Sequence, residues 1–110
     1  MALHEDWAVR GHAMVISKRH VENLSDLPDA EHLMEVYRNA ERVLLHLTGA
    51  ERAVVLKLGI MTPHLHLHIY PVRASLDRAA VMDIIEGRVH AERDEKFVEA
   101  VRAAMCADRL

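Results

Sequence analysis

Polar and apolar residues alternate strictly in one short run of the chain. Between Pro63 and Pro71, histidine stands at positions 64, 66 and 68, and leucine or isoleucine stands at positions 65, 67 and 69. Because successive side chains of an extended strand point to opposite faces, this pattern predicts a strand with three imidazole rings on one face and an apolar opposite face. Neighbouring rings on such a face lie roughly 6.5 to 7 Å apart, so one small polyatomic group can touch two or three of them.

The remaining hydrophobic pattern predicts two further strands and three helices. Runs of apolar and β-branched residues indicate the strands, and apolar residues at spacings of three and four indicate the helices. A long amphipathic helix is expected after a cap at Ser25 or Asp26 and before Gly49. The other predicted ranges are strands 12–17 and 52–58, a helix opened by Ser75 or Asp77 that runs through Ile85, and a last helix over 94–105.

The order of these elements predicts the fold class. Only Gly59–Pro63 separate the strand at 52–58 from the histidine strand, and a parallel crossover needs about a dozen residues or more, so the two strands must be antiparallel neighbours. We therefore expect an α+β fold, with one long helix and C-terminal helices packed on one face of an antiparallel sheet. The 110 residues fit a single domain, residues 1–110.

Composition narrows the choice of partner and compartment. The formal net charge of −3 provides no basic field for nucleic acid, so we expect none as a partner. One cysteine, Cys106, cannot form an intrachain disulfide, and no long apolar run suggests a membrane span. A cytoplasmic protein without a membrane partner is the prediction.

The histidine run by itself is open to three interpretations. It fits a half-exposed strand that happens to use histidine on its polar face. It also fits a zinc site in which His64, His66 and His68 supply ligands, completed by His12, His20 or a carboxylate. The third interpretation is nucleophilic catalysis, in which a neutral imidazole attacks a polyphosphate or phosphoramidate while flanking rings neutralise the developing charge.

Two motifs resemble a known family. The run His64-Leu65-His66-Leu67-His68-Ile69-Tyr70 matches the signature of the histidine triad family of nucleotide hydrolases and transferases, in which three histidines alternate with apolar residues. The segment from Gly11 to Val21 resembles the other active-site strand of that family, whose first histidine is His12 here. With the helix and strand between them, the resemblance extends over about residues 7 to 72.

The resemblance implies a mechanism and a substrate class. His66 would attack the α-phosphorus of a nucleoside phosphoramidate, dinucleoside polyphosphate or related nucleotide conjugate and form a nucleotidyl-histidine that water resolves. His68 would contact the phosphate oxygens, His64 would fix and polarise the group around His66, and His12 would complete the cluster. The covalent step needs no metal, and we expect no cofactor. A homodimer with a continuous sheet is implied as well.

The surroundings of the motif depart from the family pattern. Relatives commonly carry polar residues before the triad, where this chain has Ile60 and Met61. Thr62 and Lys57 are the remaining candidates for substrate binding, and Trp7 is a candidate for stacking on a base. These departures favour one alternative, a catalytically weak nucleotide-binding module. A second alternative, a histidine-rich metal-binding protein, rests on the spacing of His64, His66 and His68 alone.

Overall fold

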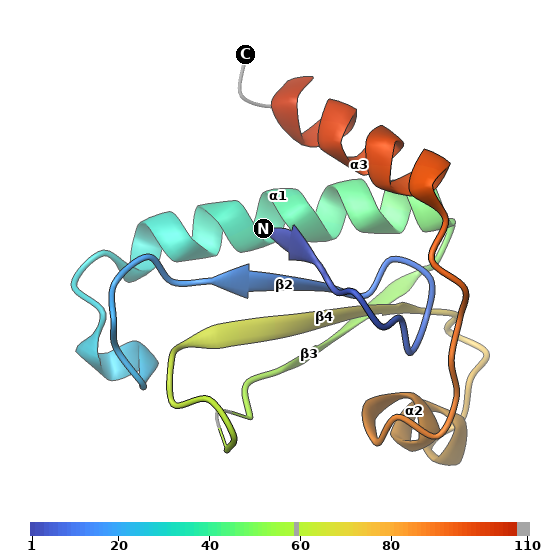
Figure 1. Ribbon diagram of the computed structural model, residues 1–110, viewed down its shortest axis with the longest axis horizontal. Coiled ribbons are helices and arrows are strands. Elements are labelled where there is room, and N and C mark those ends of the chain that lie inside the picture. The colour runs from blue at the N-terminus through green and yellow to red at the C-terminus, as the bar shows by residue number, and fades with distance from the viewer. Residues whose placement is uncertain (59, 108–110) are drawn as a thin grey trace.

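An antiparallel β-sheet lies at the centre of the protein, which we describe from a computed structural model covering residues 1–58 and 60–107 (Figure 1). Its four strands within that part of the chain are ordered β1-β2-β4-β3, and each neighbouring pair is antiparallel. The strands are β1 (Ala2–Leu3), β2 (Ala13–Ile16), β3 (Arg52–Leu56) and β4 (His66–Val72). The predicted antiparallel pairing of the histidine strand with the strand before it is confirmed.

Helices cover both faces of this sheet. They are the 3₁₀ turn η1 (Leu24–Asp26) and the α-helices α1 (Ala30–Thr48), α2 (Arg78–Ile85) and α3 (Glu95–Ala107). Figure 1 shows α1 and α3 on one side of the sheet and α2 on the other. No helix in the described ranges combines the length and apolar content that a bilayer span requires.

The main core lies between the sheet and the pair formed by α1 and α3. Ile69 of β4 and Val15 of β2 point into it, where Leu44 of α1 and Val98 of α3 meet them with almost no exposed surface. The two strands bury these residues because Ala13 pairs with Ile69 and Val15 pairs with Leu67, so that their apolar sides share one face. The imidazoles of β4 are consequently left on the opposite face.

The other face carries a smaller apolar cluster, which corrects the expected placement of the helices. Ile84 of α2 is buried with Tyr70 and Val72 of β4. Tyr70 alternates with Ile69 along the strand, so α2 packs on the face that bears the histidines rather than beside α1. The prediction that all helices share one face is therefore wrong for α2.

Several element boundaries also differ from the expected ones. The α1 helix begins after Asp29, and the expected cap Asp26 lies in the preceding 3₁₀ turn. Gly49 ends the helix in the left-handed conformation, with φ of 73°. The β1 strand was not expected, because two residues show no periodicity. Of the predicted connection Gly59–Pro63, Gly59 lies outside the described residues.

Gly11 joins the N-terminal segment to β2 at a point of close packing. Its φ of 85° lies in the left-handed region, and an added Cβ would stand 3.0 Å from Thr48 Cγ2 and 3.4 Å from Phe97 Cζ. The Thr48 side chain cannot easily move away, since its hydroxyl donates to the Leu44 carbonyl at 2.7 Å. Glycine at this position therefore allows the chain to pass close to α1 and α3 just before His12 and β2.

We expect Gly11→Ala to lower the free energy of unfolding by more than Gly49→Ala does. Both glycines have positive φ, which costs an alanine about 1 to 2 kcal/mol, but nothing lies within 4 Å of a Cβ at Gly49. Urea unfolding of the two variants measures the difference. Equal losses of stability would contradict the packing constraint at Gly11.

Candidate active site

Six histidines lie along the β2–β4 pair, from the residue before β2 to the segment after it, and we call them the histidine cluster. They come from the N-terminal segment, from β2 and its flanks, and from β4 and the residues just before it: His4, His12, His20, His64, His66 and His68. The structure thus brings together all four histidines that the sequence predicts as catalytic, and adds His4 and His20.

The three triad histidines do not lie on one continuous strand. The β4 strand begins at His66, so His66 and His68 share a face as predicted, whereas His64 precedes the strand. The backbone at this point follows the segment after β2, since Leu65 N donates to the Val21 carbonyl at 2.7 Å and Ser17 N donates to the Leu65 carbonyl at 3.0 Å. The His64 ring is accordingly directed to the end of β2.

His66 is held in one tautomer by the backbone. Its Nδ1 donates a hydrogen bond to the His64 carbonyl at 2.7 Å. A neutral imidazole carries one N–H, so this contact places the proton on Nδ1 and leaves a lone pair on Nε2. The carbonyl of His64 thus orients the His66 ring.

The His64 ring is fixed from two sides. Its Nε2 donates to the Ser17 carbonyl at 2.7 Å, and its Nδ1 lies 3.2 Å from Nδ1 of His20. When His64 is neutral its Nδ1 accepts, and His20 is the donor. From the sequence, His20 was only part of a motif and a possible metal ligand. Its contact with His64 was not predicted.

His12 is the most enclosed ring of the cluster, with 4% of its surface exposed. It stacks on Tyr70 with centroids 4.2 Å apart, and on His4 with centroids 4.5 Å apart and planes within 4° of parallel. Its Nε2 lies 3.0 Å from Nδ1 of His68, and the two nitrogens share a hydrogen bond. His68 in turn meets His66 edge to face at 5.1 Å.

Burial keeps the inner rings of the cluster neutral. Desolvation, followed by the charges of His4 and His68, lowers the pKa of His12 to about 3. Desolvation and the neighbouring His66 also lower the pKa of His68. The inner part of the site therefore offers uncharged imidazoles at neutral pH.

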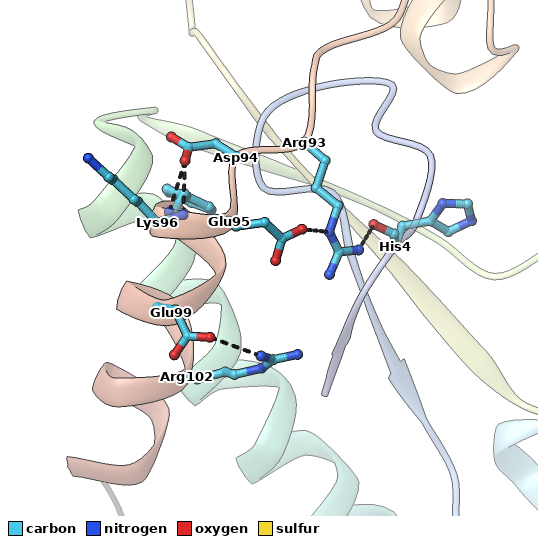
Figure 2. Close-up of polar contacts among 8 residues, drawn as sticks. His4, Arg93, Asp94, Glu95, Lys96, Glu99 and Arg102 are labelled. Atoms are coloured by element: carbon cyan, nitrogen blue, oxygen red, sulfur yellow. Dashed lines mark hydrogen bonds and ion pairs between the residues drawn. The ribbon is translucent and has the colours of Figure 1, made fainter.

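The C-terminal part of the chain fastens the segment that carries His4. Ala91 N donates to the Trp7 carbonyl at 2.7 Å. Figure 2 shows the Arg93 guanidinium between the carboxylate of Glu95 and the backbone carbonyl of His4, to which it donates at 3.1 Å. These contacts fix the backbone of His4 beside β2, although Arg93 is far from it in the sequence.

Trp7 does not occupy the position that its predicted role requires. Its side chain is 1% exposed and meets Phe97 of α3 edge to face, with centroids 5.6 Å apart. A ring enclosed in the core cannot stack on a nucleotide base, so the assignment of Trp7 to substrate binding is corrected to a packing role.

The other two predicted binding residues lie at the surface. Lys57 Nζ donates to Oδ1 of Asn23 at 3.3 Å, and the Thr62 carbonyl accepts from the His64 amide at 2.8 Å. Within the described part of the chain, neither side chain is seen in contact with the histidine rings. The residues beside them, Ile60 and Met61, are 81% and 93% exposed.

A cavity of about 710 Å³ lies elsewhere, between β2 and the N-terminal half of α1. Val15 and Leu33 line it, together with His32, and none of the six clustered histidines does. Since Val15 points to the α1 side of the sheet, this cavity and the histidine cluster are on opposite faces.

The comparison with known families agrees with this geometry. Residues 1–75 match the family model of the HIT domain, and the chain belongs to that family, which contains nucleotide hydrolases and transferases. The match includes the whole histidine cluster and the sheet, whereas α2 and α3 lie beyond it. No curated protein matches the chain closely enough to be cited as a relative.

We expect the stability of the protein to fall steeply in mild acid because of His12. The unfolded chain binds a proton on this ring near pH 6.5, whereas the folded chain excludes it until about pH 3. The contribution of the neutral His12 ring to the free energy of unfolding is thus fully present above about pH 6.5 and is lost toward pH 3. The free energy of unfolding changes by up to about 1.4 kcal/mol per pH unit in this range.

Urea unfolding between pH 7.5 and 4 measures this dependence. The free energy of unfolding should depend less steeply on pH in His12→Gln than in the wild type. The dependence should be unchanged in His46→Gln, whose side chain is exposed on α1. A His12→Gln variant with the wild-type slope would show that the ring is not buried as a neutral group.

Proposed function

We propose that this protein is a nucleotidyl hydrolase or transferase that acts on a nucleoside phosphoramidate, a dinucleoside polyphosphate or a related nucleotide conjugate. Membership of the HIT family supports the general class. The observation that carries the proposal is the hydrogen bond from His66 Nδ1 to the His64 carbonyl, because it directs the free lone pair of Nε2 away from the backbone. An uncharged, oriented nitrogen is what nucleophilic attack on phosphorus requires.

In the first step, Nε2 of His66 attacks the α-phosphorus and the bond from phosphorus to the leaving group breaks. The leaving group departs with that electron pair and takes up a proton, and a nucleotidyl-histidine remains. In the second step, water or another acceptor attacks the same phosphorus, loses a proton, and releases His66. The chemistry is balanced without a metal or a redox partner.

His68 and His12 are proposed to stabilise the phosphoryl oxygens together. In the tautomer in which His12 Nε2 donates to His68 Nδ1, the proton of His68 lies on Nε2. That N–H is then available to donate to a phosphoryl oxygen beside His66. The stacked rings of His4 and Tyr70 hold His12 in the orientation that this tautomer needs.

The test is to incubate the protein with an adenosine phosphoramidate, quench it, and measure its mass. We expect an adenylyl adduct on the wild type, no adduct on His66→Ala, and turnover lowered by about 1000-fold or more in that variant. His46→Gln serves as the control for loss of a histidine and should retain both the adduct and the turnover.

A catalytically weak binding module is the second candidate, and the exposed apolar residues Ile60 and Met61 beside the triad favour it. Tight binding of the nucleotide with neither an adduct nor turnover would support the module and exclude the enzyme. Turnover that survives in His66→Ala would exclude the proposed nucleophile.

We further propose a homodimer whose sheet continues across β3. This strand is an edge strand of the sheet, and its residue Val55 is 38% exposed. An open strand edge with apolar side chains is a suitable surface for a second copy. We also propose that residues 1–110 act as one histidine triad domain in the cytoplasm, where the free thiol of Cys106 stays reduced.

Val55→Lys should convert this dimer to a monomer, because a charge on the β3 edge opposes pairing with another strand. Sedimentation velocity of the two proteins measures the change. Val89→Lys, at an equally exposed apolar position outside the sheet, is the matched control and should remain dimeric. A dimeric Val55→Lys would place the interface elsewhere.

A further inference from the structure

We propose that His4, His12 and His68 form a binding site for a divalent transition metal ion such as zinc. The three rings come from the N-terminal segment, the residue before β2 and the middle of β4, and one nitrogen of each lies within 4.8 Å of the other two. This set differs from the triad, since His64 and His66 do not belong to it. The proposal concerns a site beyond the phosphoryl chemistry proposed above.

Two of the ligands are already close to a coordinating arrangement. His12 Nε2 and His68 Nδ1 lie 3.0 Å apart. Two nitrogens bound to tetrahedral zinc at about 2.0 to 2.1 Å are separated by about 3.3 Å. A small movement that replaces the shared proton with the ion is therefore sufficient on this side of the site. The burial of His12 favours the neutral ring, which is the form that binds metals.

His4 is held in a way typical of a metal-binding histidine. Its Nδ1 lies 2.8 Å from the Asp6 carbonyl oxygen and 3.1 Å from the Asp6 amide nitrogen. In the tautomer in which Nδ1 donates to the carbonyl, the lone pair is on Nε2. Ligating histidines commonly donate their other ring nitrogen to a carbonyl or carboxylate in the same manner. Its backbone is fixed as well, because the His4 amide donates to the His12 carbonyl at 2.9 Å and Arg93 binds the His4 carbonyl (Figure 2).

The stacked arrangement indicates how the third ligand engages. The rings of His4 and His12 are nearly parallel, so no single point lies in both ring planes. For its Nε2 to reach an ion bound to His12 and His68, the half-exposed His4 ring must turn out of the stack and give up its contact with Asp6. The proposal therefore requires a rotation of the His4 side chain that exchanges its stacking contact with His12 for a bond to the ion.

The chemistry of the donors favours zinc. Three imidazoles with a fourth position open to water suit zinc better than a hard cation such as magnesium or calcium, which requires oxygen ligands. An ion in this position occupies His68 Nδ1 and removes the hydrogen bond from His12. The site would therefore act as an inhibitory one, because His68 loses the contact that orients it toward phosphate.

The direct test is zinc titration of untagged protein by calorimetry, together with the visible spectrum of the cobalt-loaded protein. We expect one ion per chain and the intense absorption of four-coordinate cobalt. Removal of a ligand in His4→Gln or His68→Gln should lower the zinc affinity by about 100-fold or more, which exceeds the usual effect of removing an outer-shell group. His46→Gln and His64→Gln, which leave the three ligands intact, should bind zinc as the wild type does.

Absence of stoichiometric zinc binding by the wild type would overturn the proposal. Equal losses of zinc affinity in His4→Gln and His46→Gln would overturn it as well. A loss confined to His64→Gln would place the ion on the triad instead. Where turnover is measurable, zinc should inhibit it, and His4→Gln should raise the inhibiting concentration by the same factor as it weakens binding. Zinc binding is measured without the proposed phosphoryl reaction, so a failure of the zinc site can be distinguished from a failure of the proposed function.

Discussion

The antiparallel pairing of β2 with β4 is the constraint on which the whole site depends. Its register sets Ala13 against Ile69 and Met14 against His68. Val15 and Ile69 consequently face α1, and His12 meets the rings of His68 and Tyr70 on the other side. A shift by one residue would exchange the two faces and bury the imidazoles in the core. The core and the chemistry are thus fixed by the same hydrogen bonds.

The histidines in this cluster are alike in type but differ in environment. His66 is oriented by a backbone carbonyl, His64 lies between another carbonyl and His20, and His12 is desolvated between two rings. Backbone acceptors decide which nitrogen of a ring holds the proton, and burial decides whether a second proton can bind. In the proposed mechanism, these two effects give one residue type two roles, the nucleophile and the group that supports the phosphate.

The sequence was sufficient for those features that depend on local pattern. Alternation identified the histidine strand, helical spacing identified α1, and a short connection required antiparallel neighbours. Features that depend on long-range contacts could not be predicted from local sequence pattern. His4 is positioned by the two-residue strand β1, which it follows. Trp7 is buried because Phe97 and Ala91, from the C-terminal part of the chain, pack against it. The face chosen by α2 likewise depends on where Ile84 meets Tyr70.

The central claim is that the backbone sets the tautomer of His66 and so prepares it for attack. Nitrogen-15 NMR of the histidine side chains near neutral pH measures that tautomer directly, because protonated and bare ring nitrogens have distinct chemical shifts. The account predicts that His66 carries its proton on Nδ1 and has a bare Nε2. A His66 ring protonated on Nε2, or on both nitrogens, would contradict it.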